Sequence, residues 1–172
     1  LADALAKLPN TDKGAKILGI SFKDDSLLKR MKKLGFDSVM RLDLIKDVGS
    51  DNNYGGVETI QNLLDVSRAK IIAKKHGKFD LILARHILEH TYEISEFIAA
   101  LKELLNPKGH ILFEVPDYTK SSEQFDYSTI WEEHTVYFTP ETFKNCFSFY
   151  KLDINRFELF SYTMENSLVA IV

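Results

Sequence analysis

The sequence predicts a single α/β domain built on a doubly wound, mostly parallel sheet of seven strands, a Rossmann-like arrangement. Short apolar runs alternate with segments of helical periodicity, and this alternation is typical of a parallel sheet covered by helices. The last two apolar runs follow each other directly, which predicts one antiparallel strand. Apolar residues make up 45% of the 172-residue chain, enough for one packed core spanning residues 1–172.

The expected strands are short apolar runs, most of them bounded by turn-forming residues. Residues 79–84 and 110–115 are nearly continuous apolar runs, which indicates strands buried on both faces. Pro116 ends the second of them. The full set of expected strands comprises residues 16–20, 38–42, 58–64, 79–84, 110–115, 152–162 and 167–172.

Apolar residues at helical spacing lie between these strands. Ser26 is placed to cap a helix that Gly35 ends, and Pro140 at a first helical position predicts another helix to about residue 150. Residues 48–56 are rich in Gly, Asn and Asp and predict a loop. The other expected helices are residues 1–8, 66–76 and 93–105, and residues 117–133 are expected to form an irregular insertion.

The composition of the chain narrows the kinds of partner and site that it can have. The net charge is −3 and no run of Lys or Arg stands out, so we expect no nucleic-acid partner. No apolar run approaches the roughly 20 residues of a membrane span, so we expect no membrane partner. The single cysteine, Cys146, excludes an internal disulfide and a cysteine-cluster zinc site, and it fits a cytoplasmic location. Because the chain does not begin with Met, we expect it to be part of a longer chain with flanking domains.

Ligands of doubly wound sheets bind at the carboxyl ends of the strands, so candidate residues are sought there. The first such loop has no glycine after Gly19, although nucleoside cofactors usually require glycines here. Asp43 ends the second strand and could accept hydrogen bonds from ribose hydroxyls. A strand-end aspartate that starts a turn is an equally good interpretation.

Two further strand ends carry histidines. Residues 86–90 match the H-x-x-E-H pattern of one zinc-protease type, but that pattern needs a long helix and here it directly follows a strand. We therefore expect no metal and two partly exposed histidines. Glu133 and His134 form a workable acid–base pair, although spacing alone favours a lid loop whose Trp131 and Tyr137 pack on the core.

Several blocks together resemble a known family. Residues 79–90 (FDLILARHILEH), 114–117 (EVPD) and 129–134 (TIWEEH) are the most specific, and residues 58–64 (ETIQNLL) and 165–168 (ENSL) agree in order and spacing. From about residue 16 to the end, the chain resembles class I S-adenosylmethionine-dependent methyltransferases, specifically the sugar C-methyltransferases.

The resemblance implies methylation of a carbon beside a ketone on a nucleotide-linked deoxysugar or a similar small molecule. A base removes a proton from that carbon, and the enolate attacks the methyl group of the cofactor. By position, His134 would be the base, Glu133 its partner, and His90 would lie near the substrate. S-adenosylmethionine would be held by Asp43 at the ribose, Leu63 and Leu64 at the adenine, Ala84 and His86 at the amino-acid end, and Ser21 and Asp24 in the first loop.

The chain also departs from the family. Where the family has an acidic residue followed by three alternate glycines, this chain has Gly19, Ser21, Lys23 and Asp25, and we expect those side chains to obstruct the cofactor. Trp131 stands where the family has Tyr. The family's cysteine-rich zinc domain and its C-terminal domain are absent from this sequence. Two interpretations therefore remain: an active methyltransferase, or a degenerate domain that binds no cofactor and serves in binding or assembly.

Overall fold

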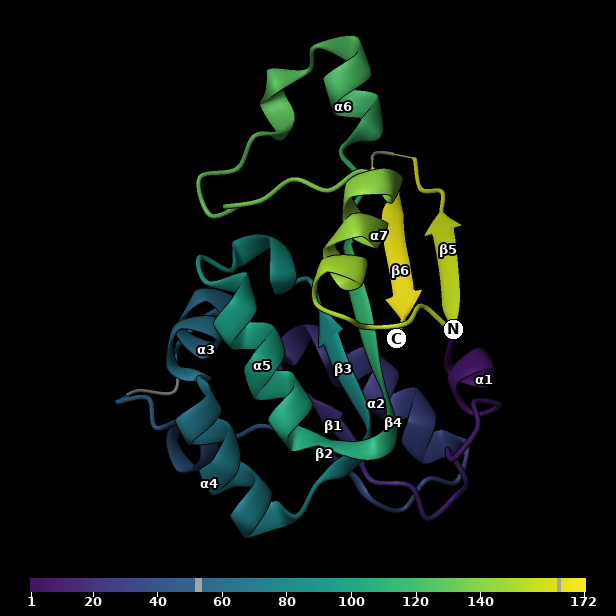
Figure 1. Ribbon diagram of the computed structural model, residues 1–172. Helices are drawn as coiled ribbons and strands as arrows, with labels where there is room; N and C mark the ends of the chain where they lie inside the picture. Colours follow the sequence, from purple (N-terminus) through teal and green to yellow (C-terminus); the bar gives the residue numbers. More distant parts are fainter. Residues whose placement is uncertain (52–53, 164) are drawn as a thin grey trace.

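A mostly parallel sheet forms the centre of the protein. The structure, a computed structural model, describes residues 1–51, 54–163 and 165–172. Over these residues the strand order is β2-β1-β3-β4-β6-β5 (Figure 1). Strands β1 to β4 run parallel to one another, and β6 is antiparallel to both of its neighbours. The strands are β1 (Ile17–Gly19), β2 (Val39–Arg41), β3 (Phe79–Arg85), β4 (Leu105–Pro116), β5 (Arg156–Phe160) and β6 (Ser167–Ile171).

The sheet confirms the predicted fold class but has one strand fewer than expected. The expected strand at residues 58–64 was wrong, because this segment forms the helix α3 (Val57–Leu63). Val57, Ile60 and Leu64 are buried, and their spacing of three and four residues is helical rather than alternating. One edge strand of the described sheet is therefore β2, and the other is β5.

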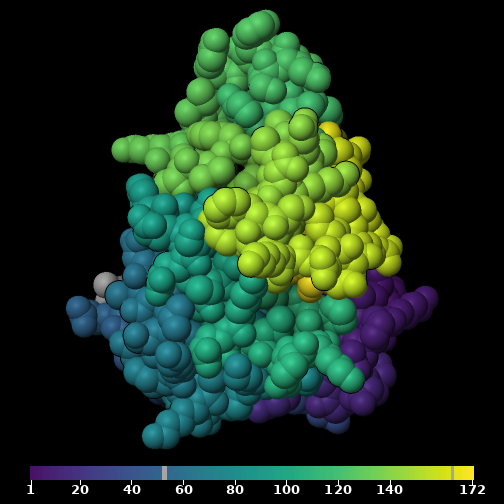
Figure 2. Space-filling view, in the orientation of Figure 1, coloured from purple at the N-terminus to yellow at the C-terminus, as the bar shows by residue number. Residues whose placement is uncertain are grey.

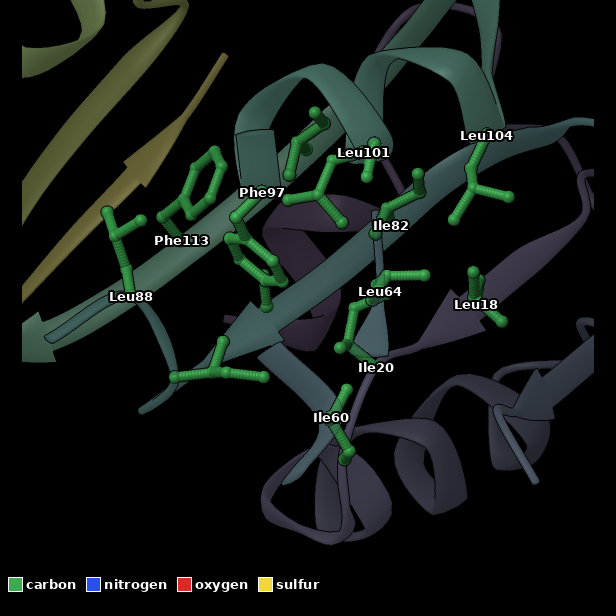
Figure 3. Packing of buried hydrophobic residues seen from close by; sticks show 14 of the residues in the cluster. Leu18, Ile20, Ile60, Leu64, Ile82, Leu88, Phe97, Leu101, Leu104 and Phe113 are labelled. Atoms are coloured by element: carbon green, nitrogen blue, oxygen red, sulfur yellow. The ribbon is translucent and has the colours of Figure 1, made fainter. Parts of the chain in front are cut away.

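Helices cover both faces of this sheet. Successive strand residues point to opposite faces, so Leu18 and Ile82 pack with α3, α4, α5 and α7 (Figure 3). Ile17 and Leu81 pack with α1 and α2 on the other face. The remaining helices are α1 (Ala2–Leu5), α2 (Asp25–Lys33), α4 (Val66–His76), α5 (Ile94–Leu104), α6 (Thr119–Gln124) and α7 (Pro140–Phe149), with short turns η1 (Phe22–Asp24), η2 (Leu44–Val48), η3 (Leu88–His90) and η4 (Tyr127–Thr129).

The start of α7 was predicted well, but the start of α2 was not. Thr139 caps α7 through Thr142 N, and Pro140 follows at the first helical position. The expected cap at Ser26 was wrong, because α2 already begins at Asp25. Asp43 caps η2, a π-helical turn in place of a regular helix after β2.

The insertion at 117–133 contains α6 and η4 and rises beyond the carboxyl ends of β3 and β4 (Figure 1). It stands out as a lobe above the body of the molecule (Figure 2). The insertion thus provides a wall beside the strand ends, where the candidate site lies.

Among the described residues, no helix is both long and apolar enough to cross a membrane.

Candidate functional site

The loop after β1 folds as the short turn η1 rather than as a glycine loop. Ser21 caps this turn: its hydroxyl accepts a hydrogen bond from Lys23 N, and its side chain is buried. Asp25 forms an ion pair with Arg41, with Nη1 and Oδ2 2.8 Å apart. Two of the three side chains expected to obstruct a cofactor are therefore held by other partners.

Asp24 lies at the centre of this loop and is fully buried. Its carboxylate accepts hydrogen bonds from the backbone N–H groups of Ile20, Ser21 and Arg85 at 2.9, 3.0 and 3.3 Å. Burial raises the pKa of Asp24 to about 7, although the N–H of Ser21 and the Arg85 guanidinium act in the opposite direction. Asp24 thus holds the loop closed between β1 and β3.

The position of Asp24 explains the missing acidic residue at Gly19. A Cβ atom on Gly19 would lie 2.9 Å from the Asp24 Cβ and 2.6 Å from Leu28 Cδ1, too close for any side chain. The space beside the end of β1 is thus taken by the Asp24 side chain. The chain has a buried carboxylate at this strand end, but it comes from residue 24 instead of residue 19.

A cleft of about 280 Å³ opens beside this loop, at the carboxyl ends of β1 and β2. Its size is close to the lower end of the roughly 300–1,000 Å³ typical of ligand pockets. Apolar and aromatic side chains form most of its wall, so it fits the adenosine part of a nucleoside cofactor. The lining residues are Ile20, Ser21, Phe22, Arg41, Leu42, Leu44, Tyr54, Gly55 and Ile60.

Of the predicted cofactor residues, Ser21 lines this cleft, whereas Asp43 and Leu63 line two other hollows of the described surface. Asp43 follows Leu42 directly and is exposed, and its Oδ1 accepts from Ile45 N and Lys46 N at 3.1 and 2.7 Å. Its Oδ2 makes no hydrogen bond within the described ranges and is available to a ribose hydroxyl. Leu63 is 38% exposed, whereas Leu64 is buried in the core.

The end of β3 places two other predicted residues. Ala84 is fully buried, and His86 follows in a left-handed conformation with φ of +49°. The His86 ring lies between two carboxylates, 3.5 Å from Glu89 Oε1 and 3.4 Å from Glu114 Oε1. Burial alone would lower the pKa of His86, but these two carboxylates raise it to about 9. His86 therefore carries a positive charge at neutral pH.

Glu114 shares this network and was not singled out by sequence reasoning. Its Oε2 lies 2.5 Å from Nε of Arg85. Burial would raise the pKa of Glu114, but His86 and Arg85 lower it to about 2. Two cations and a carboxylate are thus fixed at the ends of β3 and β4.

His90 and His134 lie together near the same carboxyl ends of the strands, although 44 positions separate them in the sequence. Their rings are in edge-to-face contact with centroids 4.8 Å apart. His90 Nδ1 lies 3.1 Å from the Glu133 carbonyl oxygen and 3.1 Å from Glu58 Oε1. Burial lowers the pKa of His134, the nearby Glu89 acts against this, and His90 adds to it.

The structure corrects one contact expected in this cluster. Glu133 touches the site through its backbone carbonyl, which pairs with His90, and its side chain is exposed. The carboxylate with the strongest effect on His134 is Glu89, which is buried. The expected packing of Trp131 on the core was wrong, because Trp131 is 57% exposed and only its backbone bonds to the Tyr137 hydroxyl.

Sequence reasoning missed Glu89 and Glu58 as site residues. Glu89 was present in the H-x-x-E-H pattern, but that pattern drew attention to the two histidines. Glu58 was assigned to a strand, whereas α3 brings its carboxylate to His90. Both would have been found by asking which carboxylates could reach a histidine at the sheet edge.

Comparisons with known proteins agree with this architecture. The family model described as a methyltransferase domain matches residues 1–154. The chain is 30% identical over 101 residues to the C-methyltransferase NovU of Streptomyces niveus, covering 59% of this chain and 24% of that protein. It is 25% identical over 160 residues to a ubiquinone biosynthesis O-methyltransferase of Bartonella tribocorum, covering 91% of this chain and 61% of that protein.

The chain therefore spans less than two thirds of the length of these curated relatives. Among solved structures, it resembles the 1,6-didemethyltoxoflavin-N1-methyltransferase of Burkholderia thailandensis, with a TM-score of 0.62 and 12% identity over 99% of this chain and 74% of that one. That enzyme was solved with S-adenosylhomocysteine bound. The chain belongs to the methyltransferase-domain family and has the fold of class I S-adenosylmethionine-dependent methyltransferases.

Proposed function

We propose that this domain transfers a methyl group from S-adenosylmethionine to an acidic carbon beside a ketone, on a nucleotide-linked deoxysugar or a similar small molecule. The observation that carries the proposal is the contact between His134 and His90 next to the buried Glu89. The similarity to a curated C-methyltransferase supports it.

His134 is the proposed base. Its pKa lies below its usual value because the ring is partly buried, so the imidazole is neutral at pH 7 and has a free lone pair. A neutral imidazole can take the proton from the carbon next to the ketone. Glu89 then stabilises the imidazolium that forms, since of the nearby charges its carboxylate has the largest effect on the pKa of His134.

His90 is a positioning residue in this proposal. Glu58 and the Glu133 carbonyl hold its Nδ1, so the ring is fixed edge-on against His134. A fixed neighbour keeps the His134 ring in one orientation, and such orientation is a large part of catalysis.

The cofactor supplies an electrophilic methyl group on a sulfonium centre. The cleft beside β1 and β2 would take its adenosine part. Asp43 and Leu63 line other hollows, so their side chains would have to turn toward this cleft to reach the ribose and the adenine. Ala84 and the charged His86 would lie toward the amino-acid end, with the His86 ring held between Glu89 and Glu114. Ser21 lines the cleft, and Asp24 supports the loop from behind, since it is fully buried.

The test is deuterium exchange at the α-carbon of a nucleotide-linked keto-deoxysugar in D₂O. His134→Ala should reduce the exchange rate at least about a hundredfold, the lower range for a general base, without changing cofactor affinity. His76→Gln serves as the matched control, because His76 pairs with Asp47 at the end of α4. An unchanged exchange rate in His134→Ala would remove this residue from the role.

The same experiment separates carbon from oxygen acceptors. The ubiquinone biosynthesis relative is an O-methyltransferase, so an oxygen acceptor is the competing chemistry. Methyl transfer to a hydroxyl without exchange at the α-carbon would reject the carbon acceptor and keep the methyltransferase assignment.

A further inference from the structure

We propose that Glu89, His90 and His134 form a binding site for a divalent transition-metal ion of the Zn²⁺ type. Each of the three residues offers one ligand atom, and these atoms all lie within 4.8 Å of one another. The residues come from η3 and from the segment after η4, so the fold and not a local sequence pattern brings them together. This differs from the expectation that the chain holds no metal.

Glu89 provides an independent sign that a ligand is missing. It is 2% exposed, and among the described residues its Oε2 has no hydrogen-bond partner. Its other oxygen, Oε1, lies near His86 Nδ1. An unpartnered buried carboxylate oxygen is costly, and a cation at this position would remove that cost.

His90 has the environment of a metal ligand. Its Nδ1 is held by Glu58 Oε1 and by the Glu133 carbonyl oxygen, both at 3.1 Å. Metal-binding histidines usually donate one ring N–H to a carboxylate or a carbonyl, which fixes the ring and leaves the other nitrogen for the metal. For His90 that other nitrogen is Nε2.

His134 completes the set. Within the part of the chain that the structure describes, neither of its ring nitrogens makes a hydrogen bond, and its ring lies against His90. The site is thus two imidazoles and one carboxylate. This donor set suits Zn²⁺ and similar ions and not Mg²⁺, which prefers oxygen ligands.

The geometry needs only a small adjustment. Ligand atoms around a tetrahedral ion with bonds of about 2.0–2.1 Å lie about 3.4 Å apart, so the most distant pair would close by somewhat more than an ångström. His134 is partly exposed and directly follows the insertion, where such a movement is easiest. Three protein ligands leave a fourth position open to water or a small molecule.

The metal and the proposed proton transfer compete for the same atom. A metal bound to His134 takes a lone pair of its imidazole, so His134 cannot also accept a proton there. This consequence rests on the proposed function: Zn²⁺ should inhibit methyl transfer, and a chelator should restore it. The metal site itself does not depend on that function.

The test is a calorimetric titration of chelator-treated protein with Zn²⁺, together with the visible absorption of added Co²⁺. We expect one ion per chain and at least about tenfold weaker binding in Glu89→Gln and in His134→Ala. His76→Gln and Glu141→Gln, which change the same residue types elsewhere on the surface, should bind as the unaltered chain does.

Circular dichroism identifies a Glu89→Gln variant that fails to fold, and the partly exposed His134 then carries the comparison. No one-to-one binding, or unchanged affinity in folded Glu89→Gln and His134→Ala, would overturn the proposal. One-to-one binding in a chain without methyl transfer would support the metal site and count only against the proposed function. Stimulation of methyl transfer by Zn²⁺ would overturn the inhibitory role.

Discussion

Two histidines beside the end of β3 lie in environments that move their pKa values in opposite directions. Burial lowers the pKa of His134, whereas Glu114 and Glu89 outweigh burial and raise the pKa of His86 to about 9. A titration followed by NMR of the imidazole protons should therefore show one histidine that titrates near pH 9 and one below pH 6.5. His86→Gln and His134→Ala assign the two signals. Two ordinary values near 6.5 would contradict the described network.

The same shift has a consequence for stability. Since the pKa of His86 is raised in the folded protein, its contribution is full below about pH 6.5 and is lost as the pH rises toward 9. The difference in the free energy of unfolding between the unaltered chain and His86→Gln should shrink over that window. Urea unfolding at several pH values measures it, and a constant difference would count against the charged pair.

At the residue scale, the sequence could place candidates at strand ends but could not assign their partners. His90 and His134, which the sequence named on separate segments, lie in ring contact in the structure, because both follow strand ends of the same sheet. Glu133 was paired with His134 because the two are adjacent and because the family resemblance implies it, although adjacent side chains need not face each other. Burial distinguishes Glu89 from Glu133, and it depends on tertiary contacts such as those of Thr135 and Val136, whose N–H groups donate to the Glu89 carbonyl oxygen.

At the scale of elements, the turn after β1 depends on the pair Gly19 and Asp24. Gly19→Asp should destabilise the protein by about 1–3 kcal/mol, because its side chain would collide with Asp24 and Leu28. Asp24→Gly should cost a similar amount, since three backbone N–H groups lose their acceptor. The double variant should cost less than the sum by at least about 1 kcal/mol.

Denaturant unfolding of the four proteins in that cycle gives the coupling. Strictly additive costs would show that the two positions do not share one space. The conservative variant Asp24→Asn is a useful addition, because it keeps the side-chain size but removes the charge. It should be milder than Asp24→Gly if filling the space beside Gly19 matters as well as the hydrogen bonds.

The helix whose bounds were predicted best has capping residues in the sequence at both of its ends. The helix α4 was predicted with its observed bounds, because Asp65 caps it and Gly77 ends it. The helix α3 was mistaken for a strand because residues 58–64 were taken as a short strand-like run and the resemblance agreed, although Val57, Ile60 and Leu64 have helical spacing. Local signals fix the ends of elements, whereas a family pattern can assign the wrong type.

In the molecule as a whole, the parallel direction of the strands brings the candidate site residues together at the carboxyl ends of the sheet. Parallel strands β1 to β4 end on the same side, so the cleft, the charged pair around His86 and the His90–His134 contact all lie on that side. The insertion, which sequence analysis described only as irregular, rises beyond this end of the sheet, and the segment directly after it supplies His134 (Figure 1). Its shape could not be predicted because it lacks any periodic pattern.

The most direct test of this account is calorimetric titration of the protein with S-adenosylmethionine and S-adenosylhomocysteine. The account predicts micromolar binding at one site per chain. Asp43→Ala should weaken it at least about tenfold, the scale of a hydrogen bond to a charged group. Asp37→Ala, at the opposite end of β2, should leave it unchanged. No binding at millimolar ligand would contradict the account and favour a domain that keeps the fold without the cofactor.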